Sequence, residues 1–269
     1  MADIDVVVTD LDGTLWSGRE DVHPTTVAAW RALEARGITV MVATGRRVRS
    51  AREPLARLGL APAAVVLNGA LVLDLATDER FHRHQYDAAT AATVLAAFRA
   101  AGVEPCVYVD DPDFDVYVGE QPATHPTHLA SLRTADAPSD LDDVVATVPI
   151  LMFGLMGHDD PELLGEIVAS LAGTAELHLG PDGLFGGHSF TVTPLGLSKW
   201  VGVELFCAHR GLDASRVLAI GDGTNDIELL GAAAVAVVPR DGCEPARKLA
   251  DHMVSPARDG GWAEILDLV

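Results

Sequence analysis

The stretch "VVVTDLDGTLW", residues 6–16, is an apolar run that ends in two aspartates. Its valines predict a buried strand over residues 4–9, which Asp10 and Asp12 follow directly. Side chains two positions apart on an extended segment point to the same side, so both carboxylates are expected together, before Gly13 permits a turn. About 4 Å apart, two such charges repel each other by about 4 kcal/mol at an effective dielectric of about 20. A cluster of this kind needs a cation.

Strands and helices alternate along the chain that follows. Further strands are predicted over residues 38–44 and 63–68, and helices over 24–37 and 48–58 precede them. The same order returns near the other end, with a helix over 198–209, strands over 216–222 and 234–238, a short helix from 226 and a final helix from 261. Near-continuous apolar strands separated by helices are typical of a parallel sheet covered on both faces. We therefore predict an α/β fold whose Rossmann-like core domain comprises residues 1–80 and 189–269.

The intervening residues, 81–188, have a different pattern. They contain a helical segment over 88–101, strand-like segments over 105–110, 149–156 and 175–180, and a second helix over 161–171. A loop rich in proline, aspartate and histidine lies among them. This pattern predicts an α+β domain inserted into a split core domain.

Composition excludes several classes of partner. The chain of 269 residues has 49% apolar and 22% charged residues, which indicates a globular protein, and its net charge of −20 disfavours nucleic acid and acidic membrane surfaces. It has no apolar run of membrane-spanning length, and its beginning lacks the features of a signal peptide. Three widely separated cysteines are expected as reduced thiols. We expect a soluble cytoplasmic protein that needs a local positive charge to hold any anionic substrate.

Polar or acidic residues stand directly after each predicted strand of the core domain. They are Asp10, Asp12, the triplet "TGR" at 44–46, Asn68 and the run "GDGTND" at 221–226. Ligands of a parallel α/β sheet bind outside the carboxyl ends of its strands, so these residues are expected to meet.

Asp222 and Asp226 would then join the first two aspartates in one pocket. Oxygen ligands without cysteine or clustered histidine suit Mg²⁺. Taken alone, "DLDGT" and "GDGTND" are each compatible with ordinary turns. Their placement at the ends of strands in one sheet, with the Thr44 hydroxyl and with Lys199 at the start of a helix, favours a functional site.

These segments resemble the four motifs of the haloacid dehalogenase-like phosphohydrolases, and the resemblance covers essentially the full length of the chain. "DLDGTL" matches the first motif, "ATGR" the second with Thr44, "SKW" the third with Lys199, and "GDGTNDIELL" the fourth. The large insertion between the second and third motifs, together with "LNGA" after the third strand, is similar to the Cof-type (class IIB) subfamily. The resemblance implies that residues 81–188 form a C2-type α/β cap domain.

The resemblance also implies catalytic and metal-binding roles. Asp10 would be the nucleophile that attacks phosphorus and forms an aspartyl-phosphate, and Asp12 would be general acid to the leaving alcohol and then general base for water. Mg²⁺ would be held by Asp10, by the backbone carbonyl of Asp12 and by Asp222. Asp226 would lie in the outer shell and orient metal-bound waters or Lys199.

The remaining motif residues would bind the phosphoryl group. The expected phosphate-binding residues are Thr44, Gly45, Lys199 and Asn225. Arg46 would either touch phosphate or form a structural ion pair beside the acidic site. Asn68 would either line the site or cap the next element.

The resemblance implies a Mg²⁺-dependent phosphomonoester hydrolase for a small organophosphate such as a sugar phosphate, with a cap that excludes macromolecular substrates. A phosphomannomutase-like phosphotransferase, or a sugar-glycerate or disaccharide phosphatase, is an open alternative. A non-catalytic binding protein is disfavoured because Asp10, Asp12, Lys199 and Asp222 are all present. A dehydrogenase is disfavoured because no GxGxxG follows the first strand, and a dehalogenase is disfavoured by Asp12. The physiological substrate and the oligomeric state stay open.

Overall fold

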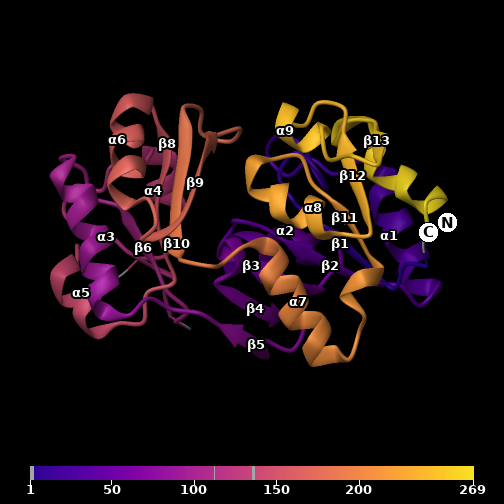
Figure 1. The fold of residues 1–269 in the computed structure, drawn as a ribbon, viewed down its shortest axis with the longest axis horizontal. Helices are drawn as coiled ribbons and strands as arrows, with labels where there is room; N and C mark the ends of the chain where they lie inside the picture. The colour runs from indigo at the N-terminus through magenta and orange to yellow at the C-terminus, as the bar shows by residue number, and fades with distance from the viewer. Residues whose placement is uncertain (1–2, 112, 135–136) are drawn as a thin grey trace. The chain divides into compact units, whose positions relative to one another are not determined.

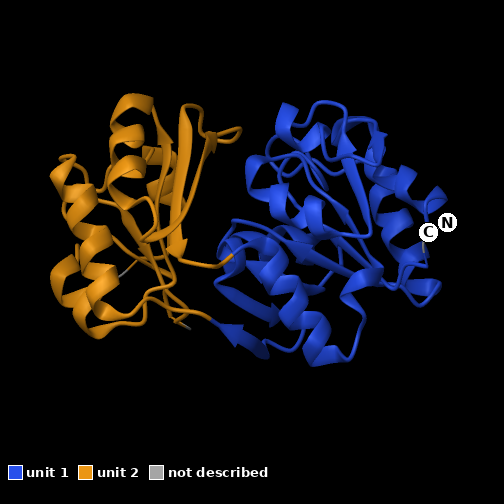
Figure 2. Ribbon diagram, viewed as in Figure 1, with its two compact units in different colours: residues 1–83, 198–269 blue, residues 84–197 orange. Residues whose placement is uncertain are grey.

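The computed structural model describes residues 3–111, 113–134 and 137–269. The chain forms two compact units, shown in different colours in Figure 2. The first comprises Met1–Arg83 and Ser198–Val269, and the second comprises His84–Leu197. The boundaries predicted at 80/81 and 188/189 lie earlier in the chain than the observed ones, which follow Arg83 and Leu197. The reason is that β5 (Arg80–Arg83) pairs within the first unit and β10 (His188–Pro194) pairs within the second.

The first unit is built on one large sheet with the strand order β13-β12-β11-β1-β2-β3-β4-β5 (Figure 1). Neighbouring strands are parallel from β13 to β3, as predicted, and antiparallel from β3 to β5. The strands other than β5 are β1 (Val6–Thr9), β2 (Thr39–Ala43), β3 (Ala63–Val66), β4 (Leu71–Asp74), β11 (Val217–Ile220), β12 (Val235–Pro239) and β13 (His252–Val254).

Helices connect these strands. The α-helices of the first unit are α1 (Pro24–Ala35), α2 (Val48–Arg57), α7 (Lys199–Arg210), α8 (Ile227–Ala232) and α9 (Glu244–Arg247). Its 3₁₀ helices are η1 (Leu67–Gly69), η2 (Ala214–Arg216), η3 (Thr224–Asp226), η4 (Ala257–Asp259) and η5 (Gly261–Asp267). Within the described ranges, no helix combines the length and the apolar character that crossing a membrane requires.

Both faces of the large sheet are covered. Val6 and Val8 of β1 pack in one apolar cluster with Val203 of α7. Val7 points to the opposite face and is equally buried. Burying each of these side chains contributes roughly 1.5–3 kcal/mol. Burial on both faces explains why β1 is a continuous apolar run in the sequence.

The strand order places β1 at the point where the chain changes direction across the sheet. From β1 the chain adds β2 and β3 on one side, and after the second unit it adds β11, β12 and β13 on the other. Ligands bind outside the carboxyl ends of the strands at such a switch point. The residues that follow β1, β2 and β11 therefore meet at one edge of the sheet.

The second unit contains a smaller antiparallel sheet with the strand order β7-β6-β8-β10-β9. Its strands other than β10 are β6 (Cys106–Tyr108), β7 (Val116–Tyr117), β8 (Met152–His158) and β9 (Ala175–Pro181). Its helices are α3 (Ala88–Ala100), α4 (Pro126–Ser131), α5 (Leu141–Thr147) and α6 (Pro161–Leu171). Phe98, Phe153 and Phe190 are buried together between helix and sheet residues in its own apolar core. The predicted fold class, a parallel-sheet core with a separate α+β unit, is confirmed.

The structure differs from the sequence prediction in several short elements. The helix predicted from Gly261 is the 3₁₀ helix η5, and the elements α9 and β13 carry too few residues for a periodic pattern to reveal them. The antiparallel strands β4 and β5 likewise fall in a stretch for which no strand was predicted.

Candidate active site

Several hydrogen bonds fix the backbone that carries Asp10. Its amide donates to the Ile220 carbonyl on β11 at 2.9 Å, just past the end of β1. The Thr9 hydroxyl donates to the Asp10 carbonyl at 2.6 Å and accepts from the indole N–H of Trp262 at 3.0 Å. Thr9 and Trp262 are buried, so water competes little for these bonds. The Asp10 carboxylate is therefore presented from a well-defined backbone position.

Lys199 bridges two buried carboxylates. Its Nζ donates to Oδ1 of Asp10 at 2.6 Å and to Oδ1 of Asp226 at 2.7 Å, and only 1% of its side chain is exposed. The residue stands at the first position of α7, after Ser198, whose hydroxyl accepts from the Val201 amide at 3.3 Å as an N-cap. An ammonium group has three N–H donors, so one is left after these two bonds for an oxygen of a ligand.

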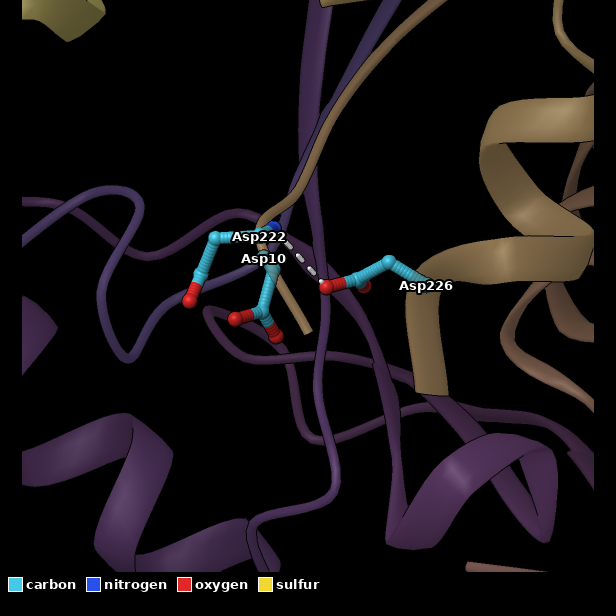
Figure 3. Close-up of side chains that lie close together, drawn as sticks. All are labelled: Asp10, Asp222 and Asp226. Atoms are coloured by element: carbon cyan, nitrogen blue, oxygen red, sulfur yellow. Dashed lines mark hydrogen bonds between the residues drawn. The ribbon is translucent and has the colours of Figure 1, made fainter. Parts of the chain in front are cut away.

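The carboxylates of Asp10, Asp222 and Asp226 gather at the carboxyl ends of β1 and β11 (Figure 3). Each offers an oxygen, and these oxygens lie within 4.8 Å of one another. Asp226 is fully engaged within the protein. Its Oδ1 accepts from Lys199, and its Oδ2 accepts from the backbone N–H groups of Asp222 at 3.1 Å and of Gly223 at 2.9 Å.

Gly13 gives Asp222 the room to approach the first motif. The residue has a φ of +85°, and a Cβ atom there would lie 2.4 Å from Oδ2 of Asp222. A side chain would therefore be both strained and in collision. The next residue, Thr14, donates its hydroxyl to Oδ1 of Asp222 at 2.5 Å. The "DGT" part of the first motif thus positions a carboxylate of the fourth.

Asp12 forms a two-pronged ion pair with Arg46. Nε of Arg46 donates to Oδ2 of Asp12 at 2.6 Å, and Nη2 donates to Oδ1 at 2.6 Å. The indole N–H of Trp16 donates to the same Oδ1 at 3.0 Å. The Asp12 side chain is still 47% exposed, so a ligand can reach it. Of the two roles considered for Arg46, the ion pair is present.

The residues after β2 and β3 lie against the fourth motif. Nδ2 of Asn225 donates to Oδ1 of Asn68 at 3.1 Å. A Cβ atom at Gly45 would lie 3.0 Å from that same Oδ1 and 3.5 Å from Nδ2 of Asn225, so a side chain at position 45 would crowd both amides. Thr44 is buried, and its Oγ1 accepts from the Arg46 amide at 3.2 Å. Gly45, Asn68 and Asn225 therefore form one group beside Thr44.

Burial and mutual repulsion shift the pKa values of the acidic groups in the site. Burial raises the pKa of Asp10 well above its ordinary value, and the neighbouring carboxylates raise it further against the charge of Lys199. Burial and the charge of Asp226 raise the pKa of Asp222 to about 7. Desolvation works to raise the pKa of Asp12 also, but the hydrogen bonds and charge of Arg46 outweigh it and hold that pKa below its ordinary value.

The donor set fits a hard divalent cation. Lys199 bonds to one oxygen of Asp10, and Thr14 bonds to one oxygen of Asp222. Asp226 already accepts on both of its oxygens, which suits it to an outer-shell role rather than to direct ligation. The raised pKa values of Asp10 and Asp222 are what a cation between them would relieve.

Three contacts of the site were not anticipated from the sequence. Thr14 belongs to the first motif, and a hydroxyl in that turn was a usable signal for its bond to Asp222. Trp16 directly follows the first motif, and although its side chain is buried, its indole N–H contacts Asp12. Glu20, which pairs with Arg46, lies outside every motif. All ten predicted site residues lie in the first unit.

The comparisons with known proteins identify the family. A family model described as haloacid dehalogenase-like hydrolase matches residues 7–266. The chain therefore belongs to the haloacid dehalogenase-like hydrolase family, and the predicted membership is confirmed.

Curated relatives match along nearly the full length. A phosphoglycolate phosphatase of Methanopyrus kandleri is 24% identical over 264 residues, which cover 97% of this chain and 95% of the relative. A phosphoglycolate phosphatase of Haloarcula marismortui is 25% identical over 263 residues, which cover 98% of this chain and 96% of the relative. The prediction of an enzyme, a phosphatase of this family, is confirmed by the family and by these relatives.

Solved structures share the fold. A phosphatase of the superfamily from Bacteroides thetaiotaomicron aligns with a TM-score of 0.80 and 21% identity, covering 98% of this chain and 94% of that one. A sugar phosphatase of subclass IIB aligns with a TM-score of 0.78 and 21% identity, covering 98% of each chain. The chain thus shares its fold with solved phosphatases of this superfamily, as predicted from the motifs.

Proposed function

We propose that the chain is a Mg²⁺-dependent phosphomonoester hydrolase that works through an aspartyl-phosphate on Asp10. The observation that carries the proposal is the placement of Asp10, a buried carboxylate bonded to Lys199 at 2.6 Å at the end of the central strand β1. A nucleophile next to a fixed cation, with Asp222 close by, can meet an anionic phosphoryl group without added repulsion.

In the first step, an oxygen of Asp10 attacks phosphorus while the bond from phosphorus to the leaving oxygen breaks. The protonated form of Asp12 donates its proton to that leaving oxygen, and the alcohol departs. The free donor of Lys199 and the Thr44 hydroxyl bind oxygens of the phosphoryl group, with Gly45 and Asn225 beside them. Arg46 and Trp16 hold Asp12 at the outer side of this site.

In the second step, water attacks phosphorus of the aspartyl-phosphate and Asp12 takes the proton of that water. The bond between phosphorus and the Asp10 oxygen breaks, which releases inorganic phosphate and restores the carboxylate. Mg²⁺, when bound by Asp10, Asp222 and the Asp12 carbonyl, would neutralise charge on the phosphoryl oxygens. Asp226 keeps Lys199 in place throughout.

The substrate we propose is a small organophosphate with an alcohol leaving group, such as a sugar phosphate. The names of the relatives support this size class, because they include phosphoglycolate phosphatases and a sugar phosphatase. A phosphate-release screen against phosphorylated sugars, phosphoglycolate and nucleotides, with and without Mg²⁺, tests it. Release from macromolecular phosphoesters alone would contradict it.

Asp12→Asn tests the acid/base role. With p-nitrophenyl phosphate, whose leaving group departs without a proton, we expect the variant to give a burst of p-nitrophenolate close to one per active site. Slow turnover should follow, because breakdown of the aspartyl-phosphate lacks its base and falls by about 10²–10⁴-fold. Stopped-flow absorbance measures both phases. Breakdown at the normal rate would show that Asp12 is not the base.

Binding of Mg²⁺ should stabilise the fold more at high pH than at low pH. A carboxyl group with a folded pKa raised to about 7, such as Asp222, favours the fold while protonated. That contribution is complete below the ordinary pKa of about 3.9 and is lost as pH rises through the folded pKa, when the carboxylate becomes available to a cation. At about pH 8, Mg²⁺ at ~100 times its Kd should raise the Tm by roughly 5–10 °C.

Differential scanning calorimetry with and without Mg²⁺ measures this difference. At about pH 5 the shift in Tm should be much smaller, because protons compete for the same oxygens. Asp222→Asn should remove most of the shift at either pH, whereas Asp241→Asn, at an exposed surface pair with Arg258, should leave it unchanged. An equal Tm shift at both pH values would contradict the assignment.

A further inference from the structure

Arg46 donates hydrogen bonds to both carboxylate oxygens of Asp12. The two bonds run from Nε to Oδ2 and from Nη2 to Oδ1, each 2.6 Å long, which is the parallel fork geometry of a guanidinium on a carboxylate. A single point charge would attract the carboxylate but leave it free to rotate. The fork sets the plane of the carboxylate as well as its position.

Arg46 is itself held rigidly. Its Nη1 donates to Oε1 of Glu20 at 2.6 Å and to the Ser50 carbonyl at 2.7 Å, and its guanidinium carbon lies 4.9 Å from the centre of the Trp16 ring. Only 11% of the Arg46 side chain is exposed. Exposed ion pairs contribute little because both side chains remain mobile. Arg46 differs from such exposed pairs because each of its three side-chain nitrogens donates a hydrogen bond, which restricts its motion.

Asp12 needs this support because, apart from the two bonds from Arg46, its carboxylate accepts a single hydrogen bond, from the Trp16 indole. Its side chain is 47% exposed, on the loop that follows β1. An exposed aspartate can adopt several rotamers, whereas proton transfer requires its oxygen within hydrogen-bonding distance of one particular atom. Lys199, the cation at the centre of the site, bonds to Asp10 and Asp226 instead.

We propose that Arg46, braced by Glu20 and Trp16, is a positioning residue that holds the Asp12 carboxylate in the orientation for proton exchange with the leaving oxygen. This inference rests on the proposed acid/base role of Asp12. It predicts that losing the two bonds from Arg46 lowers kcat/KM most for substrates whose leaving group must be protonated. A loss of phosphate binding or of folding would not discriminate between leaving groups.

The test compares kcat/KM of Arg46→Gln on two substrates. For an alkyl phosphate such as glycerol 3-phosphate, kcat/KM should fall at least about tenfold, because the leaving alkoxide needs a proton. For p-nitrophenyl phosphate it should change little. Arg46→Lys, which keeps the charge without the fork, should show the same selectivity. Full recovery by lysine, or equal losses on both substrates, would overturn the proposal.

A matched control comes from the same ion-pair network. Arg57 pairs with the other carboxylate oxygen of Glu20, and its side chain is 63% exposed. Arg57→Gln should leave kcat/KM for both substrates unchanged. Glu20→Gln removes the negative charge that pairs with Arg46 and leaves Asp12 unchanged, so it weakens one of the two braces and should reproduce the selectivity of Arg46→Gln to a smaller extent. Circular dichroism shows whether Arg46→Gln folds. If it does not, Glu20→Gln still tests the proposal, and a Glu20→Gln variant without selectivity would then overturn the proposal.

Asp12→Asn separates this proposal from the one on which it rests. If Asp12→Asn discriminates between the two leaving groups but Arg46→Gln does not, the positioning role is wrong and the acid/base role stands. If neither variant discriminates, the acid/base role itself fails. If both discriminate, the double variant should lose little beyond Asp12→Asn alone, because both changes remove the same function. Losses that add in the double variant would overturn the positioning role.

Discussion

Replacing Asp10 with asparagine is expected to reduce Mg²⁺-dependent phosphate release from p-nitrophenyl phosphate by at least about 10⁴-fold, while the protein stays folded. A neutral amide oxygen is too weak a nucleophile to attack phosphorus, but it can still accept the bond from Lys199 that the carboxylate now accepts at 2.6 Å. Continuous phosphate detection measures the rate, and circular dichroism checks the fold.

Asp5→Asn is the matched control for this change. Asp5 lies just before the same strand, is 38% exposed at its side chain, and pairs with Arg216 away from the site. The same chemical substitution there should leave turnover unchanged. Normal turnover in Asp10→Asn would show that another group is the nucleophile.

Lys199→Met has the second large effect, on both activity and stability. Methionine has a similar length but no charge, so Asp10 and Asp226 lose the cation between them. We expect kcat to fall by about 10²–10³-fold, as when a donor to a developing oxyanion is removed. The free energy of unfolding at about pH 8 should fall by about 3–5 kcal/mol, the usual cost of leaving a buried charge unpaired.

Urea denaturation at two pH values measures the stability effect. The loss should be smaller at about pH 5, because carboxyl groups left without a cation can be protonated there. The other lysine of the chain provides the control. Lys248 is 71% exposed and pairs with Glu244 on the surface, so Lys248→Met should change stability by less than about 1 kcal/mol. Unaltered turnover in Lys199→Met would contradict its place in the site.

The parallel part of the core was predictable because burial leaves a direct record in the sequence. The continuous apolar run of β1 is needed for packing on both faces, and the same holds for β2 and β11. The polar residues that follow these strands could then be assigned to one edge. β13 and α9 were missed because they are too short for periodicity, and β10 carries no sign of which sheet it joins.

The site was predictable where a motif residue acts through its own strand end. Asp10 and Asp222 are of this kind, and Lys199 was predictable in the same way from the start of its own helix. Contacts that depend on how loops fold back were not predictable. Glu20, which pairs with Arg46, itself has a φ of 67°. No local pattern in the sequence marks such a position. The bracing of Arg46, and through it the positioning of Asp12, therefore became visible only in the structure.

The most direct test of the account is to find the phosphoryl group on the protein. Asp12→Asn protein is mixed with p-nitrophenyl phosphate and Mg²⁺, quenched in acid after the burst, and digested for peptide mass spectrometry. We predict the added mass of one phosphoryl group on the peptide that spans residues 6–16 of the variant, located at Asp10 and removed by hydroxylamine. A phosphoryl group on another residue, or a burst with no phosphorylated peptide, would contradict it.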